Sequence, residues 1–232
     1  MHAVRTLVLE IRDTLRRLSA ANQQATQVVS ILERMNLTSR HQNEWAVNTP
    51  PHDCEIERAI NNMPPELNAL STALNNALPQ LQWRIDRGIY YESDADVGDG
   101  YRDGNMHCEL IGPDGSAFLH DDFTLGLFLL KPRVLYRDHA HLAPELYLTL
   151  TGPTGWRIED GLWQDKPPGA ILWNAPETGH ATRVYSEPFL SIYSWTRDVR
   201  SKCRVVPRPD WSEIEQALGT MPLPTQLGKD LR

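Results

Sequence analysis

The chain has 232 residues, 41% hydrophobic and 23% charged, and a formal net charge of -7 at pH 7. This length and composition fit one globular domain with an extension and argue against a disordered or fibrous protein. The acidic balance argues against a nucleic-acid partner, because such proteins concentrate Lys and Arg to replace the counterions of phosphate. Charges interrupt the apolar residues of the N-terminus, and no stretch reaches the roughly 20 apolar residues of a membrane span. We therefore expect a cytoplasmic protein without a membrane partner.

Residues 1–80 show the periodicity of amphipathic helices. Apolar residues recur at helical spacing over residues 1–36, and the segment TPPHD at 49–53 ends this pattern. Pro64 and Pro65 suit the first turn of a further helix that ends near residue 80. We expect the apolar faces of these helices to pack on the rest of the domain or against a second subunit, which would give a homodimer.

From Trp83 onward the sequence changes to short strand-like segments separated by Gly, Pro, Asp and Asn. These segments are WRIDRGIYY, FTLGLFLL, ELYLTLTG, AILWN, HATRVY and FLSIYSW. No helical pattern of βαβ length lies between them, which favours antiparallel sheets closed into a barrel or jelly roll. The tail returns to a short helix, WSEIEQAL, with Asp210 as its expected N-cap and Glu213 completing a capping box.

The segment HAHLAPE places His139, His141 and Glu145 within seven positions. Side chains at i and i+2 of a strand point to the same face, so both imidazoles project together, and Glu145 follows from the next strand. His180, at the start of a later strand, supplies a fourth ligand. Imidazole and carboxylate ligands without thiolate suit a divalent transition metal such as Zn, Fe, Mn, Ni or Co, and the sequence does not choose among them.

The segment HAHLAPE and the segment that ends in PETGH at His180 resemble the two motifs of the cupin superfamily. The sequence departs from the cupin pattern at Arg133, where a glycine is expected. It also has PETGH in place of the usual P-x-G-x-x-H and lacks the asparagine that normally follows. The resemblance implies a mainly β fold, a cupin double-stranded β-helix, with an α-helical N-terminal extension. We expect a helical extension over 1–80, a cupin barrel over 81–200, and a tail with a short helix over 201–232.

Aromatic residues are frequent around the expected metal site. Tyr147 follows Glu145 at same-face spacing and should point inward, which makes it a candidate general base. Tyr136 is a second candidate, although its strand parity is opposite to that of the histidines unless a bulge intervenes. Other aromatic side chains could surround a cationic ligand. His107 and His120 lie on earlier segments without such partners, and we interpret them as structural.

The longer run from Tyr136 to Tyr185 resembles the cupin dimethylsulfoniopropionate lyases of marine bacteria, most closely the branch called DddL. In that family the metal holds the substrate carboxylate, and a tyrosine removes the proton beside it so that dimethyl sulfide leaves and acrylate remains. The resemblance implies that the substrate carries a carboxylate and a sulfonium. It assigns the four ligands to the metal, Tyr147 to the base and Tyr136 to a supporting or alternative catalytic role. The expected residues of the sulfonium pocket are Trp173, Tyr185, Tyr193 and Trp195.

Two other functions remain open from the sequence. An iron-dependent cupin dioxygenase would use the same four ligands, although a base beside the metal suits proton abstraction better. A non-catalytic cupin that binds a small molecule would keep the barrel and use the N-terminal helices for interaction.

Overall fold

The computed structural model describes residues 2–18, 22–37, 49–113, 115–221 and 223. The helices are α1 (His2–Leu18), α2 (Gln23–Arg34), α3 (Asp53–Asn61), α4 (Asn68–Ala77), α5 (Asp99–Gly104) and α6 (Trp211–Leu218), with 3₁₀ turns η1 (Pro65–Leu67) and η2 (Leu78–Gln80). The strands are β1 (Asn105–Gly112), β2 (Phe118–Leu119), β3 (Thr124–Leu130), β4 (Leu135–Ala140), β5 (Glu145–Thr149), β6 (Thr154–Ile158), β7 (Gln164–Lys166), β8 (Ile171–Asn174), β9 (His180–Arg183), β10 (Phe189–Trp195) and β11 (Arg204–Val205).

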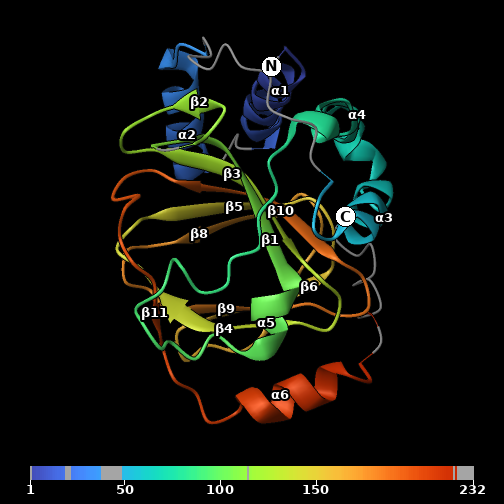
Figure 1. The fold of residues 1–232 in the computed structure, drawn as a ribbon, viewed down its shortest axis with the longest axis vertical. Helices are drawn as coiled ribbons and strands as arrows, with labels where there is room; N and C mark the ends of the chain where they lie inside the picture. Colours follow the sequence, from blue (N-terminus) through green and yellow to red (C-terminus); the bar gives the residue numbers. More distant parts are fainter. Residues whose placement is uncertain (1, 19–21, 38–48, 114, 222, 224–232) are drawn as a thin grey trace, which may run out of the picture.

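The strands form two facing sheets. The six-stranded sheet has the order β2-β1-β3-β10-β5-β8, and the five-stranded sheet has the order β11-β4-β9-β6-β7. Most pairs are antiparallel and join strands distant in sequence, as in β3 with β10 and β4 with β9. The N-terminal helices lie outside the larger sheet and α6 lies outside the smaller one (Figure 1). This arrangement confirms the expected cupin jelly roll with N-terminal helices.

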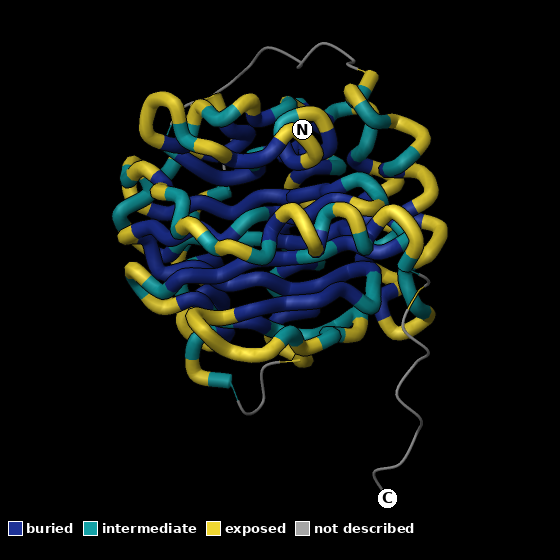
Figure 2. The backbone as a smooth tube through the Cα atoms, turned by 90° about the horizontal axis from the view of Figure 1, so that it is seen from below, coloured by how far each residue is buried: buried dark blue, intermediate teal, exposed yellow. Residues whose placement is uncertain are grey.

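Alternation along the strands divides the six-stranded sheet into two faces. Its outer face and the helices share one apolar cluster, in which Leu127 of β3 and Leu148 of β5 join Leu7 of α1 and Leu74 of α4. Figure 2 shows the strands as buried layers, with exposed positions concentrated in helices and connecting loops. The helices therefore pack on the barrel, as one of the two expected arrangements requires. A homodimer and the three-part division of the chain stay predictions.

A bulge in β4 decides which side chains enter the barrel. The register between β4 and β9 shifts between Tyr136 and His139. Arg137 and Asp138, between them, both turn outward to α6, where Arg137 pairs with Glu215 and the buried Asp138 accepts from the Trp211 indole. Because two consecutive side chains point outward, Tyr136 and His139 both point inward despite their odd spacing.

Arg133 occupies a turn that glycine would favour. Its φ is +66°, in the left-handed region that non-glycine residues rarely adopt. The backbone N–H of Arg133 donates to the carbonyls of Val184 and Tyr185, and its guanidinium donates to the carbonyls of Leu218 and Gly219 at the end of α6. These bonds hold the turn with arginine at the position where the cupin pattern expects glycine.

Two local expectations are wrong. The segment WRIDRGIYY forms no strand and has only isolated bridges, from Arg84 to His107 and from Tyr91 to Cys203. Asp210 makes no side-chain cap on α6, because its carboxylate pairs with Arg157 of β6. Among the described residues, no helix combines the length and the apolar character needed to cross a membrane.

Truncating Leu74 in α4 should destabilise the barrel together with the helices, because this fully buried side chain belongs to the cluster that joins them. For Leu74→Ala we expect the free energy of unfolding to fall by about 2–5 kcal/mol, as measured by urea denaturation. Far-UV dichroism and tryptophan fluorescence should report one shared transition. Asn75→Ala on the exposed face of the same helix should change little, and separate transitions for helices and barrel would contradict the shared core.

Candidate metal centre

Four predicted ligands meet inside the barrel, where the two sheets face each other. His139 lies near the end of β4, His141 directly follows that strand, Glu145 begins β5 and His180 begins β9. All four are at most 3% exposed. One ligand atom from each histidine lies within 4.8 Å of those of the other two. The corner after His141 thus brings Glu145 back to the histidines, as the sequence predicts.

Backbone carbonyls orient the three imidazoles. The Nδ1 atoms of His139, His141 and His180 lie 2.8–2.9 Å from the carbonyl oxygens of residues 137, 143 and 178. A carbonyl only accepts, so each Nδ1 carries a proton, and in a neutral imidazole the lone pair is then on Nε2. Such bonds to the second ring nitrogen fix histidine ligands in metal sites.

Glu145 receives two hydrogen bonds from other strands. The Asn174 amide donates to Oε2 and the Trp195 indole donates to Oε1, each over 2.9 Å. Oε2 also lies 3.3 Å from the Nε2 atoms of both His141 and His180. These two donors determine which carboxylate oxygen faces the imidazoles.

The electrostatics of this cluster fit a cation. Burial and the neighbouring imidazoles of His180 and His141 lower the pKa of His139 well below its usual value. Burial acts to raise the pKa of Glu145, but the charges of His141 and His180 and the hydrogen bond with His141 outweigh it and hold that pKa well below the usual value. The Nε2 of His180 is buried without a hydrogen-bond partner. Three imidazoles and one carboxylate form a donor set that suits a divalent transition metal.

Tyr147 and Tyr136 both line a cavity that reaches Glu145. Tyr147 lies on the inner face of β5 opposite Tyr193 of β10. Burial and the Glu145 carboxylate raise the pKa of Tyr147 well above its usual value. The Tyr136 ring is stacked between His139, at a centroid distance of 4.0 Å, and Tyr101, at 4.2 Å. The bulge thus resolves the parity question left by the sequence, and Tyr136 lies inside.

The four predicted pocket aromatics separate into two groups. Tyr193 and Trp195 line the cavity, and the Trp195 ring lies over His141 at a centroid distance of 4.6 Å. Trp173 packs against the helix-side cluster, because its neighbour Asn174 pairs with Glu145 and faces inward. Tyr185 lies beyond β9 in the cluster around α6. The structure therefore does not bring Trp173 and Tyr185 to the cavity.

A second wall of the cavity comes from segments in which no site residue was predicted from the sequence. Asp86, Tyr90 and Tyr101 reach it from the region before β1, and Val199 and Cys203 reach it from the region after β10. Loop residues 88–92 are joined to Cys203 by backbone hydrogen bonds.

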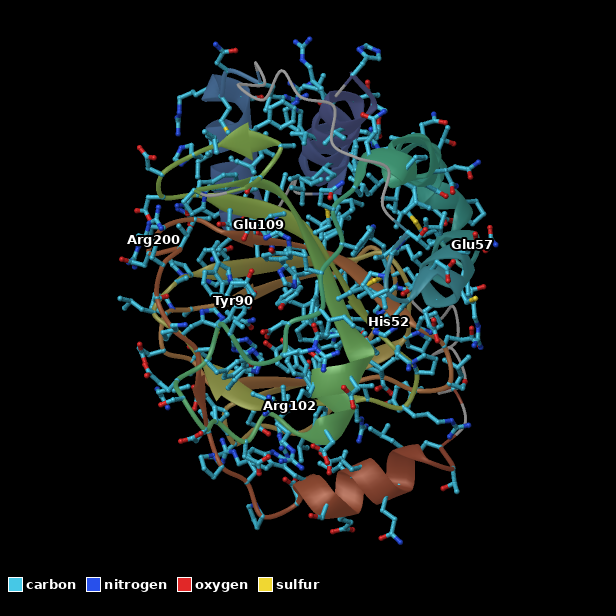
Figure 3. The ribbon with its side chains drawn as sticks, in the orientation of Figure 1. His52, Glu57, Tyr90, Arg102, Glu109 and Arg200 are labelled. Atoms are coloured by element: carbon cyan, nitrogen blue, oxygen red, sulfur yellow. The ribbon has the colours of Figure 1, made fainter. Side chains whose placement is uncertain are left out.

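His107 of β1, interpreted as structural from the sequence, also lines the cavity, and its Nε2 lies 2.9 Å from the Tyr90 hydroxyl. Figure 3 shows Tyr90 and Glu109 near the middle of the molecule and Arg200 towards its edge, and all three line an adjoining outer cavity.

Removing the Asn174 amide should weaken metal binding without removing a ligand. In Asn174→Leu, Glu145 Oε2 loses its donor and the carboxylate is free to turn, so we expect affinity for Zn²⁺ to fall by roughly 10–100-fold. Competition with a chromophoric chelator measures this change. His180→Ala should lose more affinity, whereas His120→Ala, outside the cluster, should bind like the wild type. Unchanged affinity in Asn174→Leu would show that Glu145 does not depend on this bond.

His107 should make the protein less stable at mildly acid pH. Burial lowers its pKa from 6.5 to about 4, so between these values the unfolded chain binds a proton that the folded chain does not. Stability is therefore lost as pH falls from about 6.5 to 4, and this residue alone accounts for about 2 kcal/mol between pH 7 and pH 5. Urea denaturation at both pH values should show a pH dependence smaller by that amount in His107→Gln. Equal pH dependence in both proteins would refute this role.

Comparison of the sequence with known proteins finds similarity to dimethylsulfoniopropionate lyases. The family model for dimethylsulfoniopropionate lyase matches residues 21–191. Dimethylsulfoniopropionate lyase DddQ of Ruegeria pomeroyi is 25% identical over 120 residues, which cover 52% of this chain and 57% of that relative. The matched segment is thus less than two thirds of the relative's length.

Two solved structures share the fold. A chain from the crystal structures of the DMSP lyases RdDddP and RnDddQII gives a TM-score of 0.63 at 20% identity, covering 89% of this chain and 98% of that one. DddQ from Ruegeria pomeroyi gives 0.62 at 21% identity, covering 84% and 96%. The sequence relative described here is a DddQ protein, so the narrower resemblance to DddL stays a prediction. Because the family model spans more than half of the chain, this protein belongs to the dimethylsulfoniopropionate lyase family, a family of carbon–sulfur lyases.

Proposed function

We propose that this protein cleaves dimethylsulfoniopropionate to dimethyl sulfide and acrylate, with Tyr147 as the base and a divalent metal held by His139, His141, Glu145 and His180. One observation carries the proposal: the three histidines cluster beside Glu145, and Glu145 and Tyr147 line the same cavity. A bound divalent ion would hold the substrate carboxylate and offset the negative charge that develops beside it.

The elimination needs one proton acceptor. The base takes a proton from the carbon next to the carboxylate, a C=C bond forms, and the C–S electron pair leaves with dimethyl sulfide. Tyr147 is suited to this role because it shares the inner face of β5 with Glu145 at the cavity wall. The base then returns its proton to solvent, so that atoms and charge balance.

Tyr136 is better suited to positioning than to proton transfer. Its ring is held between His139 and Tyr101, and its hydroxyl accepts a hydrogen bond of 2.8 Å from Tyr91. Both contacts restrict the ring, and the stack supports the orientation of His139. We therefore assign the base to Tyr147 and the support of the ligand to Tyr136.

Replacing the proposed base should abolish turnover and leave the ligands in place. For metal-loaded Tyr147→Phe we expect dimethyl sulfide in the headspace to fall by roughly 10²–10⁴-fold, while metal content stays at the wild-type level. Tyr185→Phe removes the same hydroxyl outside the cavity and should keep wild-type activity. Normal turnover in Tyr147→Phe would exclude Tyr147 as the base. A folded, metal-loaded wild type that releases no dimethyl sulfide would refute the lyase function, and oxygen consumption in its place would favour the dioxygenase alternative.

A further inference from the structure

The inner cavity carries an excess of acidic groups. Asp86, Glu109 and Glu145 line it, and its lining within the described part of the chain contains no Lys or Arg. A metal ion bound by the histidines would offset the charge of Glu145. The other two carboxylates lie far from the four candidate ligands in the sequence: Asp86 precedes β1 and Glu109 lies within it.

Asp86 is the more deeply buried of these two carboxylates, at 1% exposure. Its Oδ1 accepts from the backbone N–H groups of Gly88 and Ile89 over 2.8 Å, and its Oδ2 accepts from the Tyr101 hydroxyl over 2.9 Å. None of the ion pairs found among the described residues includes Asp86. Hydrogen bonds alone thus hold a charge that would otherwise need a cation.

Stacked rings connect Asp86 to the ligand cluster. Tyr101, which donates to Asp86, stacks on Tyr136, and Tyr136 stacks on His139. The charge of Asp86 acts on this wall: burial is the main cause of the raised pKa of Tyr101 and of Cys203, and Asp86 adds to both. A carboxylate at the cavity wall without an ion-pair partner among the described residues favours an onium group through direct charge attraction.

We propose that Asp86 is a specificity-determining residue that selects the cationic group of the substrate, while the ligand cluster holds the carboxylate. This role rests on the proposed function, because it assigns the sulfonium end of the same substrate. The carboxylate acts as a fixed counter-charge across the aromatic wall. It takes no part in proton transfer or in binding the metal.

A pair of unreactive ligands tests this role without turnover. One is 3-(trimethylammonio)propanoate and the other is 4,4-dimethylpentanoate, its isostere with carbon in place of the positively charged nitrogen, so their dissociation constants differ through the positive charge. Calorimetry with the zinc-loaded protein should show the cationic ligand bound about 10-fold or more tightly by the wild type. In Asp86→Asn, which keeps an acceptor for Gly88 and Ile89, this preference should fall to about 3-fold or less. With dimethylsulfoniopropionate, KM should rise by about 10-fold and kcat should change little.

Two controls separate charge from structure. Tyr101→Phe removes the hydrogen bond to Asp86 and keeps the carboxylate, so the cationic preference should remain. Asp121→Asn removes one exposed charge outside the inner cavity and should behave like the wild type. Asp86→Ser, whose hydroxyl also accepts from a turn, replaces Asp86→Asn if the latter does not fold.

The outcomes are distinct. A cationic preference that survives in Asp86→Asn, or that is lost equally in Tyr101→Phe, would overturn the role of Asp86. Absence of dimethyl sulfide from the wild type would refute the proposed reaction, and the ligand pair would still measure the selection of charge.

Discussion

The rest of the structure depends on one constraint: backbone hydrogen bonds turn the Nε2 lone pairs of the histidines towards one another and towards Glu145. Because carbonyl oxygens take the Nδ1 protons, the Nε2 atoms of His141 and His180 point at Glu145 Oε2 from 3.3 Å. Neutral imidazoles in this arrangement place three acceptors together in the buried interior, which is unfavourable unless a proton or a cation lies between them. Without a cation, the charge and hydrogen bond of Glu145 outweigh burial and raise the pKa of His141. The fold therefore builds a place for positive charge before any ligand arrives.

Contacts on the outside of the smaller sheet hold this arrangement. Asp138, beside His139 in the chain, accepts a forked pair of hydrogen bonds from Arg157 of β6. Arg137, whose carbonyl orients His139, is held by Glu215 of α6. The bulge that turns both residues outward thus turns Tyr136 and His139 inward. The C-terminal helix thus acts on the candidate metal site through one strand, although it contributes no candidate ligand.

Local patterns in the sequence were enough to predict that the candidate ligands cluster, but they were insufficient to predict the walls of the cavity. His139, His141 and Glu145 follow from strand periodicity and a tight corner, which depend on near neighbours in the chain. Trp173 failed as a pocket residue because its alternation is set by pairing of Asn174 with Glu145, a contact between strands. Asp86 and Tyr90 gave no signal because an irregular loop carries them, and its path depends on bonds to Cys203 more than a hundred residues later. Strand pairing and loop packing depend on tertiary contacts, which the periodicity of the sequence does not encode.

The cavity wall then carries two features that differ in chemistry. Glu145, which belongs to the candidate metal cluster, lines the cavity, and a bound ion would attract a carboxylate there. Asp86, whose oxygens accept hydrogen bonds from Gly88, Ile89 and Tyr101, lines it as well and would attract an onium group. In the proposed function, a molecule with a carboxylate and an onium group would meet complementary charge at both features. Its carboxylate would then lie beside the face of β5 that Tyr147 shares with Glu145. Selection of charge and placement of the reacting proton would thus depend on the same difference between the two features.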